Sequence, residues 1–350
     1  MKQTMITLSK CAPQRGAEVK EKPVPEIGED DILVKVLATS ICGTDVHIYQ
    51  WDAWSQSRIK PPQTMGHEFA GRVVKVGTRV KQVSLGDIVT AETHIVCNEC
   101  EFCRSGNAHI CQHTSVLGVD RDGAFAEYIA IPATNAIKAN PSTPVEYLSV
   151  LEPLGNAVHT VLAQDVVGKS VAVVGCGPIG IMALDVAKAA GASLVIAVDL
   201  NDYRLTLAEQ IGADACINPK HTDIIETVKS LTQGLGVDVV CEMSGNPIAI
   251  KQALNYLKYG GHMAMLGVPS QEVSINIAND IVFKGITIYG VTGRKMYSTW
   301  HQSLALVQSK KLHLDKIVTH VLPFEKYEEG FALMESGNCG KVVLTFKEES

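Results

Sequence analysis

The stretch Ser170–Gly180 reads SVAVVGCGPIG, and it decides the fold of the second half of the chain. Its first five residues are small or β-branched, which is typical of a short buried strand, and its glycines have the spacing G-x-G-x-x-G. The residues Ile179–Ala190 are predicted to form a helix, and Ser193–Asp199 (SLVIAVD) a second strand. A glycine-rich turn between a strand and a helix, followed by a strand that ends in an acid, indicates dinucleotide binding.

Each glycine of this fingerprint has a physical role. Gly175 makes the tight turn, Gly177 lets the backbone approach a pyrophosphate, and Gly180 allows close packing of helix on strand. The start of the helix, with Ile179, supplies free N–H groups and a partial positive charge to the phosphates. We therefore expect these four residues to bind a dinucleotide. The alternative is a structural glycine turn with no nucleotide.

The acid at the end of the second strand indicates which dinucleotide binds. Asp199 is expected to accept hydrogen bonds from the adenosine ribose and to repel a 2′-phosphate, which favours NAD over NADP. Arg204 could favour a 2′-phosphate instead, or lie along the adenine. Residues at the ends of later strands complete the expected cofactor site: Leu266, Gly267, Val268, Val291 and Thr292.

Strands and helices alternate through residues 156–293. Asp202–Ile211 is predicted to be a helix, and Val237–Glu242, His262–Leu266 and Ile286–Thr292 are predicted to be strands. This alternation predicts an α/β domain with a doubly wound, parallel Rossmann sheet. We expect Ile286–Thr292 at the edge of the sheet, where it could pair with another subunit.

The first part of the chain, residues 1–155, has a different pattern. Short runs rich in Val and Ile alternate with Gly and Pro, as in Asp31–Ala38, Phe69–Val76 and Asp87–Glu92, and predict a mostly β domain with antiparallel strands. In the tail, residues 294–350, Thr299–Ser309 is a predicted helix and Lys341–Phe346 a predicted strand. We expect this tail to complete the first domain.

The totals narrow the possible functions. The chain has 350 residues, enough for two domains, and a formal net charge of −6, which gives no reason to expect nucleic acid or an anionic membrane as partner. The sequence has no signal-peptide pattern, and apolar runs such as Leu194–Val198 are too short to span a bilayer. We therefore expect a cytoplasmic protein, in which clustered cysteines bind metal rather than form disulfides.

Four cysteines form one such cluster. Cys97, Cys100, Cys103 and Cys111 have the spacing C-x2-C-x2-C-x7-C, which can close a tetrahedral zinc shell with no open position. Such a shell is structural. An iron–sulfur cluster is the main alternative, but a ferredoxin-type run has a shorter last gap followed by proline.

A second set of candidate ligands lies outside the cysteine lobe. Cys42, His67, Glu68 and Glu152 offer one thiolate, one imidazole and two carboxylates, which suits an open, catalytic zinc shell. Their spacing does not enforce the grouping. From the residues alone, a second metal and an ordinary protein core are equally good interpretations.

A resemblance to a known family favours the second metal. Gly66-His67-Glu68, followed by Gly71, Gly77 and Val80, resembles the signature G-H-E-x2-G-x5-G-x2-V of zinc-containing medium-chain alcohol dehydrogenases. With the cysteine lobe and the glycine fingerprint, the match covers essentially the whole chain. The resemblance implies a GroES-like first domain and two zinc ions per chain, the catalytic one held by Cys42, His67 and a carboxylate. It also implies NAD as cofactor and a dimer or, as we expect, a homotetramer.

A narrower resemblance points to the branch of this family that acts on L-threonine. It rests on residues 42–49 (CGTDVHIY), 92–95 (ETHI), 152–160 (EPLGNAVHT) and 292–294 (TGR). It implies NAD-dependent oxidation of L-threonine to 2-amino-3-oxobutanoate by zinc-assisted hydride transfer. Whether Glu152 or Glu68 ligates the zinc stays open. The alternatives are a polyol or 2,3-butanediol dehydrogenase, and a non-catalytic zinc-stabilised NAD-binding regulator.

The remaining candidates concern the proton and the substrate. Thr44 and His47 follow Cys42 closely, and a hydroxyl followed by an imidazole can pass a proton out of the site. The alternative is that Thr44 bonds only the backbone and His47 is an ordinary surface histidine. Candidates for binding threonine are as follows: His94 or Arg294 for its carboxylate, Glu152 for its ammonium, and Trp51 and Trp54 to close the pocket.

Overall fold

The computed structural model describes residues 3–347 and divides into two compact units. Unit 1 comprises the chain up to Glu152, Val318–Ser336 and the chain from Lys341 on. Unit 2 comprises Pro153–Ile317 and Gly337–Gly340. The predicted division into 1–155 with 294–350, and 156–293, stays a prediction, and backbone contacts group residues 294–317 with unit 2.

Unit 1 is rich in short strands. They are β1 (Thr4–Lys10), β2 (Glu18–Pro23), β3 (Asp31–Ser40), β4 (Gln63–Thr64), β5 (Glu68–Val76), β6 (Ile88–Ala91), β7 (His94–Ile95), β8 (Ser115–Val116), β9 (Tyr128–Pro132), β10 (Ala136–Lys138), β17 (Val318–Pro323) and β18 (Lys341–Thr345). Its helices are α1 (Gly43–Gln50), α2 (Ala53–Arg58), α3 (Glu101–Arg104), α4 (Val145–Ser149) and α12 (Tyr327–Ser336), with short 3₁₀ turns at Ala108–Ile110, Ala133–Asn135 and Phe324–Lys326.

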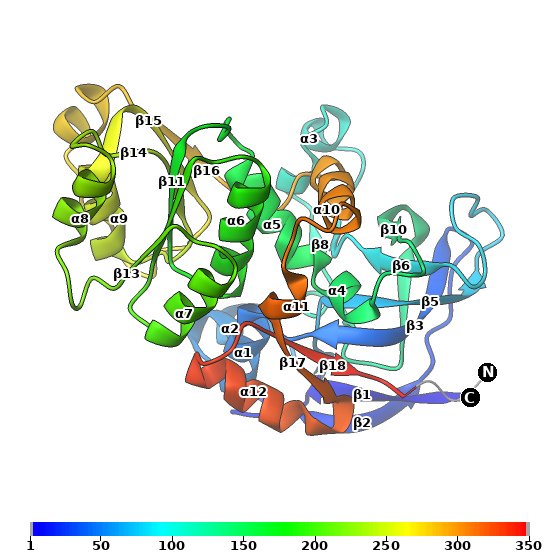
Figure 1. The fold of residues 1–350 in the computed structure, drawn as a ribbon. Helices are drawn as coiled ribbons and strands as arrows, with labels where there is room; N and C mark the ends of the chain where they lie inside the picture. The colour runs from blue at the N-terminus through cyan, green and yellow to red at the C-terminus, as the bar shows by residue number, and fades with distance from the viewer. Residues whose placement is uncertain (1–2, 348–350) are drawn as a thin grey trace. The chain divides into compact units, whose positions relative to one another are not determined.

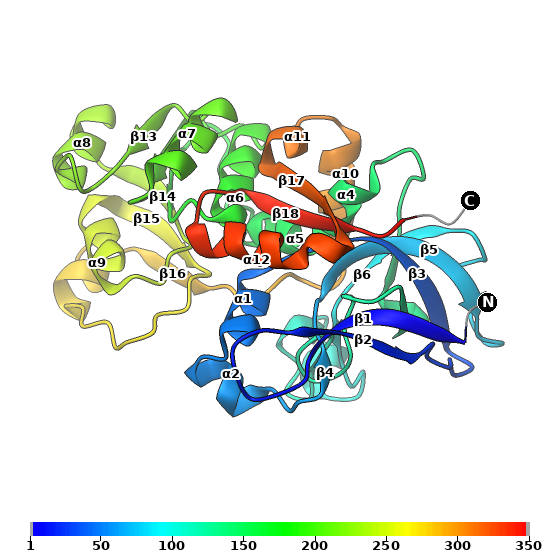
Figure 2. The ribbon, with the colours of Figure 1, turned by 90° about the horizontal axis from the view of Figure 1, so that it is seen from below.

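The main sheet of unit 1 has the order β10-β6-β5-β3-β18-β17, and β9 also pairs with β3. Strands β3, β5 and β6 confirm the three strands predicted in the first domain. Of the tail predicted to complete the first domain, the last strand lies in unit 1, where β18 pairs antiparallel with β3, with Val343 opposite Ser40. Figure 2 shows α12 lying along β17 and β18, and this packing fixes the end of the chain against the sheet.

Unit 2 alternates strands and helices. Its strands are β11 (Ser170–Val174), β12 (Leu194–Val198), β13 (Ala215–Ile217), β14 (Val237–Glu242), β15 (Leu257–Met265) and β16 (Thr287–Gly290). Its helices are α6 (Pro178–Ala189), α7 (Asp202–Gln210), α8 (Ile224–Leu231), α9 (Pro247–Tyr256), α10 (Ser298–Gln308) and α11 (Leu314–Ile317), with a π-helical turn at Ile277–Val282. Helix α5 (Leu151–Val161) begins in unit 1 and continues into unit 2.

The sheet of unit 2 has the order β13-β12-β11-β14-β15-β16, and every neighbouring pair is parallel. This order reverses at β11, as in doubly wound dinucleotide-binding sheets, so the predicted Rossmann fold is confirmed. Figure 1 shows α8 and α9 on one face of the sheet and α6 on the other. Buried side chains such as Val228 of α8 and Leu254 of α9 share one apolar cluster with Val174 and Ile196 of the sheet.

Two consequences of this topology concern function. The carboxyl ends of parallel strands meet at one edge of the sheet, which is where ligands bind in open α/β folds. Strand β16 is an edge strand of the sheet, as predicted for Ile286–Thr292.

Within residues 3–347, no helix combines the length and apolar character needed to cross a membrane.

Candidate functional site

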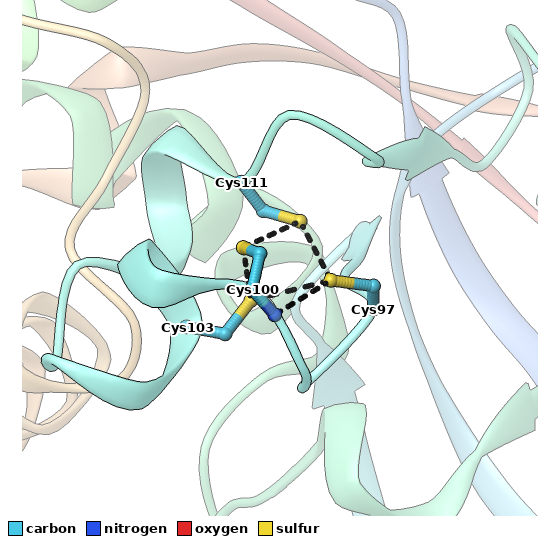
Figure 3. A group of neighbouring side chains, drawn as sticks. All are labelled: Cys97, Cys100, Cys103 and Cys111. Atoms are coloured by element: carbon cyan, nitrogen blue, oxygen red, sulfur yellow. Dashed lines mark hydrogen bonds between the residues drawn. The ribbon is translucent and has the colours of Figure 1, made fainter.

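The cysteine lobe brings four thiols together. Figure 3 shows the side chains of Cys97, Cys100, Cys103 and Cys111 converging on one point. The distance between sulfurs is 3.5 Å for Cys97 and Cys111, 3.5 Å for Cys100 and Cys103, and 3.8 Å for Cys100 and Cys111. Four sulfurs bound tetrahedrally at about 2.3 Å from a zinc ion lie about 3.8 Å apart. The lobe therefore has the size of a closed zinc shell.

Backbone amides also prepare the lobe for a cation. The N–H of Cys100 donates to the sulfur of Cys97 at 3.4 Å, and the N–H of His113 donates to the sulfur of Cys111 at 3.4 Å. The amides of Glu99 and Cys100 lower the pKa of the Cys97 thiol. Since the thiolate is the form that binds metal, these amides favour the ligand state of Cys97.

A second group gathers where β3 and β5 pair. Ser40, the last residue of β3, lies opposite Glu68, the first residue of β5. This register places Cys42, the N-cap of α1, beside His67 and Glu68. One ligand atom from each of these three residues lies within 4.8 Å of the other two. The structure thus brings together three of the four residues predicted for an open metal shell.

The carboxylate of Glu68 is fully buried and held from one side. Its Oε2 accepts from the hydroxyl of Ser40 and pairs with the ammonium of Lys341, which also donates to the carbonyl of Ile41 at 2.9 Å. Its Oε1 has no hydrogen-bond partner, whereas Nδ1 of buried His67 lies 3.7 Å from a carboxylate oxygen of Asp45. A buried polar atom without a partner is costly, so a cation bound beside Oε1, within reach of the Cys42 thiol and the His67 imidazole, fits the donor set.

Glu152 lies close to this group without belonging to it. It is buried near the start of α5, and it is not one of the three residues whose ligand atoms lie within 4.8 Å of each other. Burial by itself lowers the pKa of His67, but the charges of Asp45, Cys42 and Glu152 raise it well above its ordinary value. The geometry thus favours Glu68 over Glu152 as the third ligand.

Helix α1 carries the two predicted proton-transfer residues. Thr44 and His47 are one turn apart on the helix, Thr44 half-buried and His47 exposed, while Asp45 and Ile48 are buried. The N-cap of the same helix is Cys42. One short helix therefore positions a metal ligand, a hydroxyl and an imidazole in sequence.

A cavity of about 720 Å³ opens at the carboxyl edge of the unit 2 sheet. Four predicted cofactor residues line it: Gly175, Gly177, Asp199 and Arg204. Oδ2 of Asp199 accepts from the N–H of Cys176 at 2.7 Å and lies 3.8 Å from the guanidinium of Arg204. The carboxylate is thus fixed at the end of β12, where a ribose would meet it.

Other predicted cofactor residues lie outside this lining: Ile179, Gly180, Leu266, Gly267, Val268, Val291 and Thr292. Gly180 has a packing role, since a Cβ there would lie 1.9 Å from the carbonyl oxygen of Gly175. The last five follow β15 and β16 at the same carboxyl edge, and their contact with a cofactor stays a prediction.

Sequence reasoning missed several residues of the cavity. Ser244 and Asn246 line it after β14, and Lys220 and Tyr256 line it as well. Buried Glu242 holds this loop, since its side chain accepts from the N–H of Ser244 at 2.9 Å. The position of 243–246 directly after a predicted parallel strand was the signal that could have found Ser244 and Asn246.

The candidate substrate residues have defined surroundings. Arg294 is buried, and its guanidinium carbon lies 5.7 Å from the centre of the Trp300 ring. Nδ1 of His94 lies 3.8 Å from a carboxylate oxygen of Glu92. Trp51 and Trp54 lie near the end of α1. The ammonium of Lys10 is 4.9 Å from the centre of the Trp51 ring. The centre of the Trp54 ring is 6.3 Å from that of the His47 ring.

Comparison with known proteins gives consistent matches. Residues 28–141 match the family model of the alcohol dehydrogenase GroES-like domain, and residues 178–309 match that of zinc-binding dehydrogenases. The L-threonine 3-dehydrogenase of Caldanaerobacter subterraneus subsp. tengcongensis is 54% identical over 341 residues, which cover 97% of this chain and 98% of that protein.

Solved structures agree with the fold. A protein of Escherichia coli CFT073, described as a short chain alcohol dehydrogenase complexed with NADH, superposes with a TM-score of 0.91 at 26% identity, over 99% of this chain and 100% of that one. The 2R,3R-butanediol dehydrogenase of Bacillus subtilis has a TM-score of 0.89 at 28% identity, over 97% of this chain and 99% of that one.

The geometry of the cysteine lobe predicts that it binds a structural metal ion. Replacing Cys111→Ser should remove about one zinc ion per chain and lower the unfolding temperature, because three thiolates no longer close the tetrahedral shell. Zinc content after dialysis and thermal unfolding measure both effects. The exposed Cys216→Ser variant is the control and should match the unmodified chain. Full zinc content in Cys111→Ser would contradict the assignment.

Two glycines of the fingerprint should respond differently to alanine. Gly180→Ala forces a Cβ against the Gly175 carbonyl and should cost about 1–3 kcal/mol of stability, as overpacking does. Gly177→Ala meets no atom within 4 Å and should fold normally but bind the dinucleotide more weakly, because the pyrophosphate approaches there. Unfolding free energy and NADH binding separate the two. Equal stability losses would argue against the packing role of Gly180.

The two buried carboxylates should also differ. Glu68→Gln should lose the second metal on dialysis against a weak chelator, because only the Cys42 thiolate and the His67 imidazole then remain as strong ligands. Glu152→Gln should retain that metal and lose turnover. Metal analysis alongside initial rates distinguishes the variants. Metal loss in Glu152→Gln with retention in Glu68→Gln would reverse the assignment.

Proposed function

This chain belongs to the family of zinc-binding dehydrogenases, and on that premise we propose that it oxidises the 3-hydroxyl group of L-threonine with NAD, giving 2-amino-3-oxobutanoate. The observation that carries the chemistry is the group of Cys42, His67 and Glu68. It offers one thiolate, one imidazole and one carboxylate and leaves a coordination position for a ligand. The substrate follows from the 54% identity to an L-threonine 3-dehydrogenase over nearly the whole chain.

We assign two zinc ions to the chain. The four cysteines of the lobe hold the structural ion, and Cys42, His67 and Glu68 hold the catalytic one, with Glu152 close by. Bound there, zinc would supply a Lewis acid for the hydroxyl oxygen, and NAD would accept the hydride. The contribution of the chain itself is to hold the carboxylate of Glu68 in place, through the ammonium of Lys341 and the hydroxyl of Ser40.

The proposed cofactor is NAD rather than NADP. Asp199 presents a fixed carboxylate to the cavity in unit 2, which suits ribose hydroxyls and repels a 2′-phosphate. Arg204 lines the same cavity, but its guanidinium lies beside Asp199 and is partly neutralised by it. We assign Leu266, Gly267, Val268, Val291 and Thr292 to the nicotinamide half because they follow the neighbouring strands at the same edge.

Release of the hydroxyl proton is assigned to helix α1. Thr44 can accept the proton of the substrate hydroxyl while it donates its own, and His47, one turn further on, can pass it to water. The exposure of the His47 side chain, 58%, suits the last member of such a path.

Recognition of the amino acid requires partners for its two charges. We assign Glu152 to the ammonium and Arg294 or His94 to the carboxylate. A site that pairs both charges rejects a substrate that lacks them, because its own buried groups would then stay unpaired. Trp51 and Trp54 are assigned to the closure of the pocket.

Self-association as a homotetramer in the cytoplasm completes the proposal. Strand β16 is at the side of its sheet, and large apolar side chains around it are exposed, among them Tyr259, Phe283 and Ile288. An exposed strand edge with apolar neighbours is stabilised when a second copy covers it. Partnership with nucleic acid or membrane is not part of the proposal.

The first experiment is NADH formation at 340 nm by zinc-loaded protein. L-Threonine with NAD should exceed D-threonine, sorbitol and 2,3-butanediol by at least about tenfold in kcat/KM, and NADP should support far less turnover. Preference for a diol would overturn the substrate and keep the metal and hydride chemistry. No turnover, with only about one zinc bound per chain, would favour a non-catalytic NAD-binding regulator.

A further inference from the structure

A carboxylate touches the exposed histidine of helix α1. Nδ1 of His47 lies 2.6 Å from Oδ2 of Asp52, a short contact for a side chain that is 58% exposed. Nothing in the assignment of His47 as a proton carrier requires this partner. The role of His47 as a proton carrier therefore does not explain why Asp52 contacts it.

The backbone around Asp52 places its carboxylate beside His47. Helix α1 ends at Trp51, whose left-handed backbone (φ 61°) turns the chain back so that the N–H of Asp52 reaches the carbonyl of His47 at 3.4 Å. Asp52 is also the N-cap of α2, and its Oδ1 accepts from the N–H of Ser55 at 2.9 Å. One carboxylate oxygen is thus fixed by the helix start and the other by the imidazole.

The end of α1 is held in place from a third element. The buried ammonium of Lys10 donates to the carbonyl of Gly16 at 2.9 Å and of Tyr49 at 3.3 Å, and lies 4.9 Å from the Trp51 ring centre. The turn that presents Asp52 is therefore anchored to β1. A carboxylate with this support keeps its position better than a free surface side chain.

Among the described residues of α1 and α2 and the turn between them, Asp52 is the charged side chain that contacts the imidazole of His47. From α2, the uncharged ring of Trp54 meets that of His47 edge-on. The other charged groups of the two helices are engaged elsewhere. Asp45 is buried and accepts from the N–H of Cys42, and Arg58 pairs with Asp120.

We propose that Asp52 is a positioning residue for proton release: it accepts the Nδ1–H of His47 and so leaves Nε2 as the proton acceptor. A carboxylate in this position fixes both the tautomer and the orientation of an imidazole. This inference rests on the proposed function, in which Thr44 and His47 carry the hydroxyl proton outward.

The proton balance is simple. As the substrate O–H bond breaks, Thr44 takes that proton and gives its own to Nε2 of His47, where an N–H bond forms. The resulting imidazolium is stabilised by Asp52 and then releases the Nε2 proton to water. NAD, when bound, would accept the electron pair of the oxidised C–H bond as hydride, so no further oxidant is needed.

The decisive variant is Asp52→Asn in the zinc-loaded holoenzyme. Asparagine is as good an N-cap as aspartate, so α2 is retained. Its amide N–H, however, can donate to Nδ1 and so favour the opposite tautomer, in which Nε2 carries the hydrogen and cannot accept a proton. We expect kcat at pH 7 to fall by about tenfold to a hundredfold, with the KM for NAD unchanged. The loss should shrink towards pH 9–10, where hydroxide takes the proton directly.

Two controls isolate the effect. Asp223→Asn makes the same change at the N-cap of α8, in unit 2, and should leave kcat and its pH profile as in the unmodified enzyme. In a double-mutant cycle, Asp52→Asn should add nothing in the background of His47→Asn, because Asp52 acts through His47.

The outcomes separate the two levels of inference. A normal kcat and pH profile in Asp52→Asn, or an equal loss in the His47→Asn background, overturns the role of Asp52 and leaves the proposed reaction intact. A normal pH profile in His47→Asn overturns the relay, and the role of Asp52 with it. Absence of threonine oxidation in the unmodified enzyme overturns the proposed function itself.

Discussion

A buried ion pair between Lys341 and Glu68 connects the first-domain sheet to its metal group. Burial by itself lowers the pKa of Lys341, but the charges of Glu68, Cys42 and Glu152 raise it above its ordinary value. Both side chains are almost wholly inaccessible to solvent, and removing one partner of such a pair typically costs about 3–5 kcal/mol. The pair fixes one oxygen of Glu68 and leaves the other without a protein partner. A cation bound there would be the group that satisfies it.

The return of the chain to unit 1 at its end is what forms this ion pair. Lys341 is the first residue of β18, which pairs with β3, and the end of β3 pairs with the start of β5. Three strands thus place an ammonium, a hydroxyl and a carboxylate around one point. Immediately beyond β3, helix α1 carries Cys42 at its N-cap and the two proposed proton-transfer residues, Thr44 and His47, one turn apart. The candidate ligands and the proposed proton path are therefore positioned by β3, β5 and the helix that follows β3.

The parallel sheet of unit 2 brings residues from separate loops to one cavity. Its strands end along one edge, so glycines and an acid that are distant in sequence face one cavity. A Cβ at Gly177 would meet no atom within 4 Å, and this open space beside the start of α6 suits the proposed approach of a phosphate to backbone amides. Buried Glu242 orders the loop that follows β14 and so shapes the far wall of the cavity. The glycine turn after β11 and the acid at the end of β12, proposed to bind the pyrophosphate and the ribose, thus lie at neighbouring strand ends.

The sequence by itself determined the parts whose partners are close along the chain. The strand, turn and helix around Gly175 and the gathering of the four cysteines could be predicted, because local spacing controls local backbone and short loops. The grouping of Cys42 with His67 and Glu68 came from family resemblance, since no spacing enforces it. Only the tertiary structure decided the partner of Glu68, because Lys341 lies 273 residues away and strand pairing alone joins them. It also decided the partner of His47, because a left-handed turn at Trp51 brings Asp52 back to the helix, and such a turn leaves no periodic pattern in the sequence.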